Sequence, residues 1–139
     1  MDTRFSSAIH ILILISEAEK PLSSEHIASS VGTNASYIRK ITGLLKKGKI
    51  IESKQGVSGF KLRIPAEELS FYKIYCAVYE SDQYHVFDMH QNPNDECIVG
   101  RRIKPVLTEQ FTEIEEKAME EFKRRTLADV IESMKNYKE

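Results

Sequence analysis

Two adjacent basic residues, Arg39 and Lys40, lie in a segment whose apolar residues recur at helical spacing. That apolar stripe consists of Ile38, Ile41 and Leu45. Ser36 and Gly43 share the opposite face with the two cations, and Tyr37 lies beside them. Hydrogen-bond donors on a helix with little bulk at its middle suit the reading of base edges in a DNA groove. The alternative for this segment alone is an amphipathic helix with a solvated face.

A second group of candidate DNA contacts follows in a glycine-bearing turn. Its members could approach a nucleic-acid backbone closely or bind phosphate, and they are Lys54, Gln55, Gly56, Ser58 and Gly59. The turn joins two expected strands, residues 50–51 and 60–64, of which the second alternates between apolar and polar side chains. A solvent-exposed hairpin turn without a ligand is the alternative.

Cys97 is the residue whose surroundings suit redox chemistry. Arg101, Arg102 and Lys104 follow it closely, and positive neighbours lower the pKa of a thiol and favour the reactive thiolate. A redox switch at Cys97 is therefore one hypothesis, and a half-buried structural thiol is the other. Cys76 lies in an expected helix and is interpreted as a core residue, so the two cysteines form no disulfide framework.

Neither a metal site nor an active site is predicted. His85, Asp88, His90 and Cys97 could together bind a transition metal, but irregular segments collect such residues by chance. The sequence shows no glycine-rich phosphate loop, no nucleophile elbow and no paired acid and base on one element. We therefore expect no catalytic residue, no metal ligand and no enzyme activity.

The elements that position the candidate DNA contacts form a helix-turn-helix. An almost wholly apolar helix is expected over residues 3–18, and it needs cover on all sides, from a partner subunit among others. Two short helices follow at 24–31 and 35–47, with Ser23 and Asn34 as N-caps and Gly32 and Gly48 as terminators. A helix-turn-helix followed by a hairpin predicts a winged helix.

The second half predicts a long dimerisation helix. After a helix at 71–80 and an irregular stretch at 81–100, Pro105 is expected at the first position of a helix that reaches Arg125, about 30 Å long. Its apolar stripe, the predicted dimer contact, is Ile103, Leu107, Phe111, Ile114, Ala118 and Phe122. Thr126 and Asp129 resemble a capping box for a last short helix. Packing against its own chain is the alternative for the long helix.

Charge divides the chain into two regions. Residues 1–64 contain ten Lys/Arg and five Asp/Glu (+5), and residues 65–139 contain ten and sixteen (−6). A basic half joined to an acidic half predicts a polyanionic partner for the first half only. We therefore divide the chain into a winged-helix region at 1–65 and a helical dimerisation and sensor region at 66–139. The apolar run at 9–15 is too short for a membrane span and precedes no signal cleavage site, so we expect a cytoplasmic protein without membrane contact.

Several of these segments resemble the Rrf2 family of bacterial regulators, which includes IscR, NsrR and CymR. The resemblance rests on residues 1–15, 35–41, 44–51, 65–80 and 126–129. Within the family the chain looks most like the YwnA-like branch, which lacks the iron–sulfur cysteines. The resemblance implies a mainly α fold with a small β-hairpin, and a homodimer that places a recognition helix in the major groove of double-stranded DNA and a wing near the minor groove. By position it implies that the recognition helix contacts DNA through Ser36, Tyr37, Arg39 and Lys40, and that Gly56 and Gly59 are the wing glycines.

The chain departs from the family pattern at the wing and at the cluster. Gln55 stands where the family usually carries a minor-groove arginine, and Ser58 replaces a glycine. Cys97 falls on the last of three cluster cysteines, while Gln91 and His85 stand six and twelve residues earlier. One thiolate cannot hold a cluster that needs several ligands, so no cofactor is expected.

The function expected from the sequence is a homodimeric DNA-binding regulator, most simply a repressor, that answers a small-molecule or oxidant signal. Two alternatives stay open: a redox-responsive regulator switched by Cys97, and a winged-helix interaction module that does not bind DNA.

Overall fold

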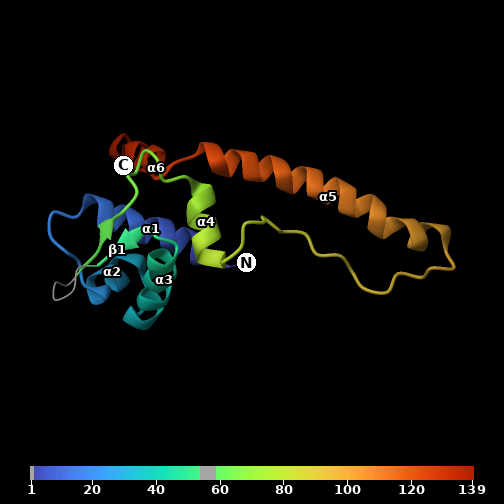
Figure 1. Ribbon diagram of the computed structural model, residues 1–139, viewed down its shortest axis with the longest axis horizontal. Coiled ribbons are helices and arrows are strands. Elements are labelled where there is room, and N and C mark those ends of the chain that lie inside the picture. Colours follow the sequence, from blue (N-terminus) through green and yellow to red (C-terminus); the bar gives the residue numbers. More distant parts are fainter. Residues whose placement is uncertain (1, 54–58) are drawn as a thin grey trace.

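The computed structural model describes residues 2–53 and 59–139. In chain order its elements are α1 (Arg4–Glu17), α2 (Ser24–Val31), α3 (Ala35–Lys47), β1 (Ile51–Glu52), β2 (Lys61–Leu62), α4 (Phe71–Tyr79), α5 (Ile98–Arg124) and α6 (Leu127–Lys135). Figure 1 shows a body made of α1–α4, the hairpin and α6, from which α5 projects as a long arm. The expected class, mainly α with a small hairpin, is confirmed.

The helix-turn-helix begins and ends at the predicted residues. The Ser23 hydroxyl accepts a hydrogen bond from the amide of His26 at the start of α2. Gly32 ends α2 at φ +84°, a left-handed conformation that glycine adopts without strain. The Asn34 side chain accepts from the amide of Tyr37 at 2.8 Å and begins α3. Local capping chemistry thus fixes both helices.

The second strand of the wing hairpin is shorter than the strand predicted from the sequence. Antiparallel pairing joins Ile51 to Leu62 and Glu52 to Lys61, and the amide of Arg63 donates to the carbonyl of Ile50 at 2.8 Å. Four of the five predicted wing contacts lie outside the described residues: Lys54, Gln55, Gly56 and Ser58.

One hydrophobic core runs through the whole body. Four residues of α1 lie at its centre: Ala8, Ile11, Leu12 and Ile15. The apolar stripe of α3 packs on them from one side, and α4 contributes Ile74 and Val78. Leu127 and Ile131 of α6 join the same core. The boundary predicted at residue 65 therefore does not coincide with a boundary of the core, because helices beyond it complete the winged helix.

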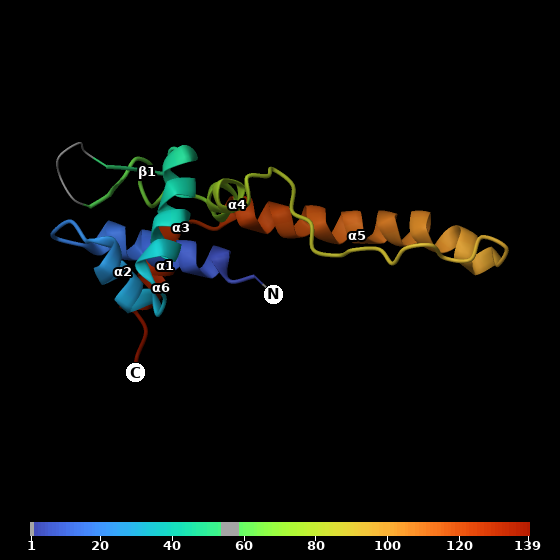
Figure 2. The ribbon, with the colours of Figure 1, turned by 90° about the horizontal axis from the view of Figure 1, so that it is seen from below.

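A short backbone bridge joins the start of α4 to the end of the returning α5. Ser70 and Thr126 form an isolated antiparallel bridge, flanked by hydrogen bonds from the amide of Phe71 to the carbonyl of Arg125 and from the amide of Leu127 to the carbonyl of Leu69, each 2.8 Å. Between these points the chain runs outward as residues 81–97 and returns as α5 (Figures 1 and 2). We call residues 81–124 the arm.

The long helix begins seven residues earlier than predicted. Its first residue is Ile98 and Pro105 lies inside it, so the expected start at the proline was wrong. A proline removes the hydrogen bond to the carbonyl four residues before it, here Arg101. Arg101 and Pro105 are both exposed, so water can satisfy that carbonyl. With 27 residues the helix is about 40 Å long.

Aromatic rings join the arm to the body. The ring of Phe122 on α5 stacks on Phe5 of α1 at 5.5 Å between centroids, and Phe71, Tyr75 and Tyr84 surround the pair. Phe122 was predicted as a dimer contact, but its ring packs within its own chain. We call these five residues the aromatic junction.

The irregular outgoing segment of the arm packs along α5. The ring of Phe87 lies 4.8 Å from that of Phe111, and the amide of Val86 donates to the Glu115 carboxylate at 2.6 Å. In the part of the chain that the structure describes, no helix is both long and apolar enough to cross a bilayer.

Candidate nucleic-acid interface

The outer face of α3 is free of contacts with the core. Ser36, Arg39, Lys40 and Gly43 are all exposed, and we call these four residues the reading face. The apolar stripe behind them is fully buried, so the predicted orientation of the helix is confirmed. A small centre at Gly43, with cations before it, allows close approach to another surface.

Tyr37 differs from the rest of the predicted contact set. It is half-buried and packs against the core, so part of its ring supports α3 from within. A contact between Tyr37 and DNA stays a prediction.

A groove of about 340 Å³ separates the reading face from the base of the wing. Its lining residues are Ser24, Arg39, Thr42, Gly43, Lys46, Ser53, Gly59 and Phe60. Two cations and three hydroxyl-bearing residues make this groove suitable for a phosphate backbone. Lys46 was missed by the sequence analysis, although its position seven residues after Arg39 places both on one helix face.

The hydroxyl of Thr42 is already satisfied inside this groove. It donates to the carbonyl of Ile38 at 2.9 Å, within reach of the carbonyl of Arg39 at 3.2 Å. Thr42 is 3% exposed, so its role is to close the floor of the groove.

Gly59 supports the wing from its base. Its φ is +102°, and a Cβ placed there would overlap the Cβ of Pro21 in the loop before α2. Gly59 was predicted as a residue that approaches DNA, but the contact that requires a glycine is one with Pro21 of its own chain. The loop from α1 to α2 therefore fixes where the wing starts.

One acidic side chain reaches the reading face. Oε1 of Glu25, in the first turn of α2, lies 3.6 Å from Nη1 of Arg39. Both side chains are largely exposed, so the pair contributes little to folding.

The tip of the arm presents Cys97 as the N-cap of α5. The backbone N–H groups of Gly100 and Val99 lower the pKa of the exposed Cys97 thiol. The lowered pKa agrees with the sequence analysis, but the predicted cause was wrong, because the amides of the first helical turn act on the sulfur and the neighbouring Arg and Lys side chains do not.

No metal-binding cluster is assembled in the described part of the chain. Groups of three or more His, Cys, Asp or Glu side chains in suitable positions are absent from these residues. His85 instead lies between two carboxylates, with Nε2 3.1 Å from Asp88 and Nδ1 3.4 Å from Glu115. Cys76 lies on α4 and is half-buried. Figure 1 shows α4 in the body, far from the end of the arm at which α5 begins. The residues present therefore do not fit an iron–sulfur cluster.

The predicted dimer stripe of α5 remains partly uncovered. None of the 27 residues of α5, all of which the structure describes, is fully buried. Ile103, Leu107, Phe111 and Ala118 are half-buried, and Ile114 is 53% exposed.

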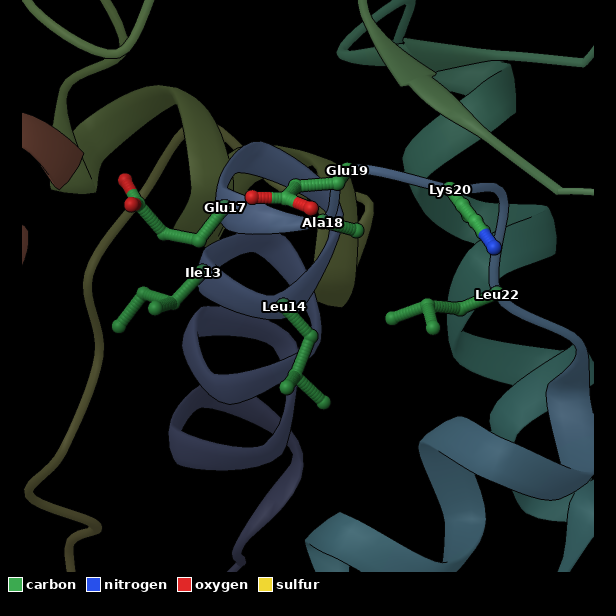
Figure 3. Close-up of a pocket in the computed structure, with 7 residues that line it drawn as sticks. All are labelled: Ile13, Leu14, Glu17, Ala18, Glu19, Lys20 and Leu22. Carbon is green, nitrogen blue, oxygen red and sulfur yellow. The ribbon is translucent and has the colours of Figure 1, made fainter.

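An apolar pocket of about 430 Å³ lies at the end of α1. It is lined by Ile13, Leu14, Glu17, Ala18, Glu19, Lys20 and Leu22. Figure 3 shows Leu22 pointing back from the following loop toward α1. Ile13 and Leu14 are only half-buried. The chain itself therefore does not cover α1 on all sides, as the sequence analysis expected for so apolar a helix.

Comparison with known proteins yields regulators. A family model described as Rrf2, iron-dependent transcriptional regulator, matches residues 1–133. YwnA of Bacillus subtilis (strain 168), named as a candidate HTH-type transcriptional regulator, is 39% identical over 131 residues, which are 94% of this chain and 96% of YwnA.

Two solved structures have the same architecture. A candidate DNA-binding protein is 38% identical, with a TM-score of 0.75 over 92% of this chain and 98% of the other. CymR, the global cysteine regulator of B. subtilis, has a TM-score of 0.71 over 100% of this chain and 98% of its own, and at 17% identity it shows the shared fold alone. YwnA and CymR are named as regulators, the remaining relative is named as a DNA-binding protein, and the matching family is one of transcriptional regulators and not of enzymes. With its exposed basic helix beside a wing, the chain belongs to the Rrf2 family of DNA-binding transcriptional regulators.

Proposed function

We propose that this regulator acts as a homodimer held together by α5. The observation that carries the proposal is that α5, described over its full length, has no fully buried residue although it carries an apolar stripe. Val99, Val106 and Ile114 are 64%, 53% and 53% exposed. A long helix with an uncovered apolar side needs a partner, and two-fold homodimers are the commonest solution.

In this dimer each α3 enters a major groove of one duplex. Ser36, Arg39 and Lys40 contact base edges, and Lys46 binds a phosphate in the groove at the base of the wing. The wing, whose described base is formed by β1, β2 and Gly59, approaches the minor groove. A dimer that occupies an operator overlapping a promoter excludes the polymerase, so the proposed outcome is repression.

The first experiment measures the mass of the protein in solution and its preferred DNA. Light scattering should give twice the mass of one chain, and Ile114→Asp should give one chain with an unchanged helix content. Selection from random duplexes should return two half-sites about one helical turn apart. Operator affinity should fall steeply with salt, because phosphate contacts release counterions.

The control for the reading face is a matched pair of alanine variants. Arg39→Ala with Lys40→Ala should abolish operator preference, whereas Lys135→Ala on α6 should not. A monomeric wild type, or an operator affinity untouched by the Arg39 and Lys40 changes, would refute the proposal.

A second candidate function, supported by the exposed Cys97 thiol of lowered pKa, is a redox response. The thiolate sulfur attacks one oxygen of hydrogen peroxide and the O–O bond breaks. Sulfenic acid forms, and the hydroxide that leaves takes a proton from solvent to become water. Peroxide treatment should change operator affinity in the wild type and leave Cys97→Ser unchanged. Equal responses in both proteins would eliminate this role.

We propose further that the regulator works without an iron–sulfur cluster. Cys97 is the sole cysteine of the arm, and the described part of the chain offers no cluster of suitable ligands. Protein purified under anaerobic conditions should show no visible absorbance of a cluster and should bind its operator.

A further inference from the structure

Glu25 is an isolated negative charge on a positively charged surface. It is the only acidic residue between positions 20 and 51, a stretch with six basic residues: Lys20, Arg39, Lys40, Lys46, Lys47 and Lys49. A residue of this charge opposes the approach of any phosphate backbone. Its position therefore calls for a reason other than general affinity for DNA.

Helix stability alone does not account for Glu25. A carboxylate in the first turn of α2 is favoured by the helix dipole, but Ser23 already caps that helix. The ion pair with Arg39 is exposed, with 73% and 60% of the two side chains open to solvent, and such pairs contribute little to folding.

Where the Glu25 carboxylate meets the Arg39 side chain is more informative about function than the strength of this ion pair. Glu25 Oε1 meets Nη1 of Arg39, whose side chain also lines the groove beside Lys46. A guanidinium carries five N–H donors in a rigid plane. At 3.6 Å the Glu25 carboxylate is too far away to accept a hydrogen bond, but its charge favours the Arg39 rotamers that bring Nη1 toward α2. An arginine side chain with fewer populated rotamers loses less freedom on binding.

We propose that Glu25 is a specificity-determining residue of the reading face. Its charge favours Arg39 rotamers from which the free N–H groups can meet a guanine edge, and the same charge penalises DNA that offers only phosphates at that point. Non-cognate DNA must approach Glu25 without the compensating base contact. This inference rests on the proposed reading of DNA by α3.

The test compares affinities for two duplexes, the best sequence selected from a random pool and a scrambled duplex of equal length and composition. Glu25→Gln keeps the shape of the side chain and removes its charge. We expect the affinity for the scrambled duplex to rise more than that for the selected one, so that their ratio falls about fivefold. Selection with Glu25→Gln should also return a less defined base at the position read by Arg39.

A second background shows whether the effect passes through Arg39. In Arg39→Ala protein, Glu25→Gln should shift both affinities by one common factor and leave the ratio unchanged. Glu132→Gln on α6 removes the same charge far from α3 and should change neither the ratio nor the selected sequence. Circular dichroism checks that α2 remains folded.

Two outcomes would overturn the inference. If Glu25→Gln raises both affinities equally in protein that keeps Arg39, Glu25 acts only as a charge. If it changes neither affinity, Glu25 does not face DNA. The proposed function fails separately: in that case Arg39→Ala itself leaves operator preference intact.

Discussion

Ser70 and Thr126 lie opposite each other in an isolated antiparallel bridge, and each is the N-cap of the helix that follows it. The Ser70 hydroxyl accepts from the amide of Lys73, and Thr126 forms a full capping box with Asp129. The two starting points of α4 and α6 are thus tied together, 56 positions apart in the sequence. This bridge fixes the point at which the chain returns from the arm to the body.

The Thr126 cap should be measurable in stability. Thr126→Ala removes the acceptor for the amide of Asp129 at the start of α6, and we expect a loss of about 1 kcal/mol in the free energy of unfolding. Urea unfolding followed by circular dichroism gives this value. Thr3→Ala is the matched control, because the Thr3 side chain makes no capping hydrogen bond, and it should lose much less. Equal losses would show that the Thr126 cap is not stabilising.

Gly59→Ala should lower the free energy of unfolding more than Gly32→Ala does. Gly59 and Gly32 both have positive φ, but only Gly59 lies against Pro21. We expect a loss of about 1 kcal/mol for Gly32→Ala from backbone strain and about 2–3 kcal/mol for Gly59→Ala, which adds the overlap with Pro21. Thermal and urea unfolding of both variants measure the difference. A smaller effect at Gly59 than at Gly32 would contradict the contact.

Gly43→Ala should separate stability from DNA binding. Nothing lies within 4 Å of the place where its Cβ would stand, so the change should stabilise α3 by about 0.5–1 kcal/mol. The added methyl group would stand at the centre of the reading face and should weaken operator binding roughly tenfold. Unfolding curves and fluorescence anisotropy with labelled operator test both effects. An unchanged affinity would place DNA elsewhere on α3.

The Cys97 thiol should react at lower pH than an ordinary cysteine. Because the amides of Gly100 and Val99 lower its pKa in the folded state, the thiolate persists below the pH at which it is lost in the unfolded chain. The linked stabilisation is present above the unfolded pKa and is lost as the pH falls through the folded pKa. In a Cys76→Ser background, the rate of iodoacetamide alkylation against pH should give a lower midpoint for folded than for urea-unfolded protein.

A backbone variant tests the cause of this shift. Val99→Pro removes one of the two N–H groups at a position where the first helical turn tolerates proline, and it should raise the pKa of Cys97. Replacing Arg101 by Ala should leave the pKa unchanged. A shift with Arg101 and none with Val99 would restore the neighbouring cations as the cause.

Local signals allowed the body to be predicted well. The bounds of α2 and α3 agree with the sequence analysis residue by residue, since Ser23, Gly32, Asn34 and Gly48 each act on groups within a few positions along the chain. The burial of the α3 stripe followed from its period, and the Thr126 capping box was read from its spacing.

Contacts between distant elements account for the features that the sequence did not predict correctly. Pro105 favoured a helix start, but α5 begins at Ile98, and its first turn lies against the backbone of Asn94 at Gly100. Phe122 fitted the dimer stripe by period, and only the meeting of α1, α4 and α5 directs its ring into the aromatic junction. The approach of Glu25 to Arg39 depends on how α2 crosses α3, which no pattern in the sequence encodes.

The location of the core has a consequence for how this protein can change. All its buried apolar side chains lie between Ala8 and Val78 or at Leu127 and Ile131, and none of the described residues 81–124 is among them. The arm, which carries Cys97, is therefore joined to the body through the Ser70–Thr126 bridge and the aromatic junction. Substitutions at the far end of the arm should leave the folding of the body unchanged. A change in the chemistry at the tip of the arm therefore needs no compensating change in the body that carries the reading face.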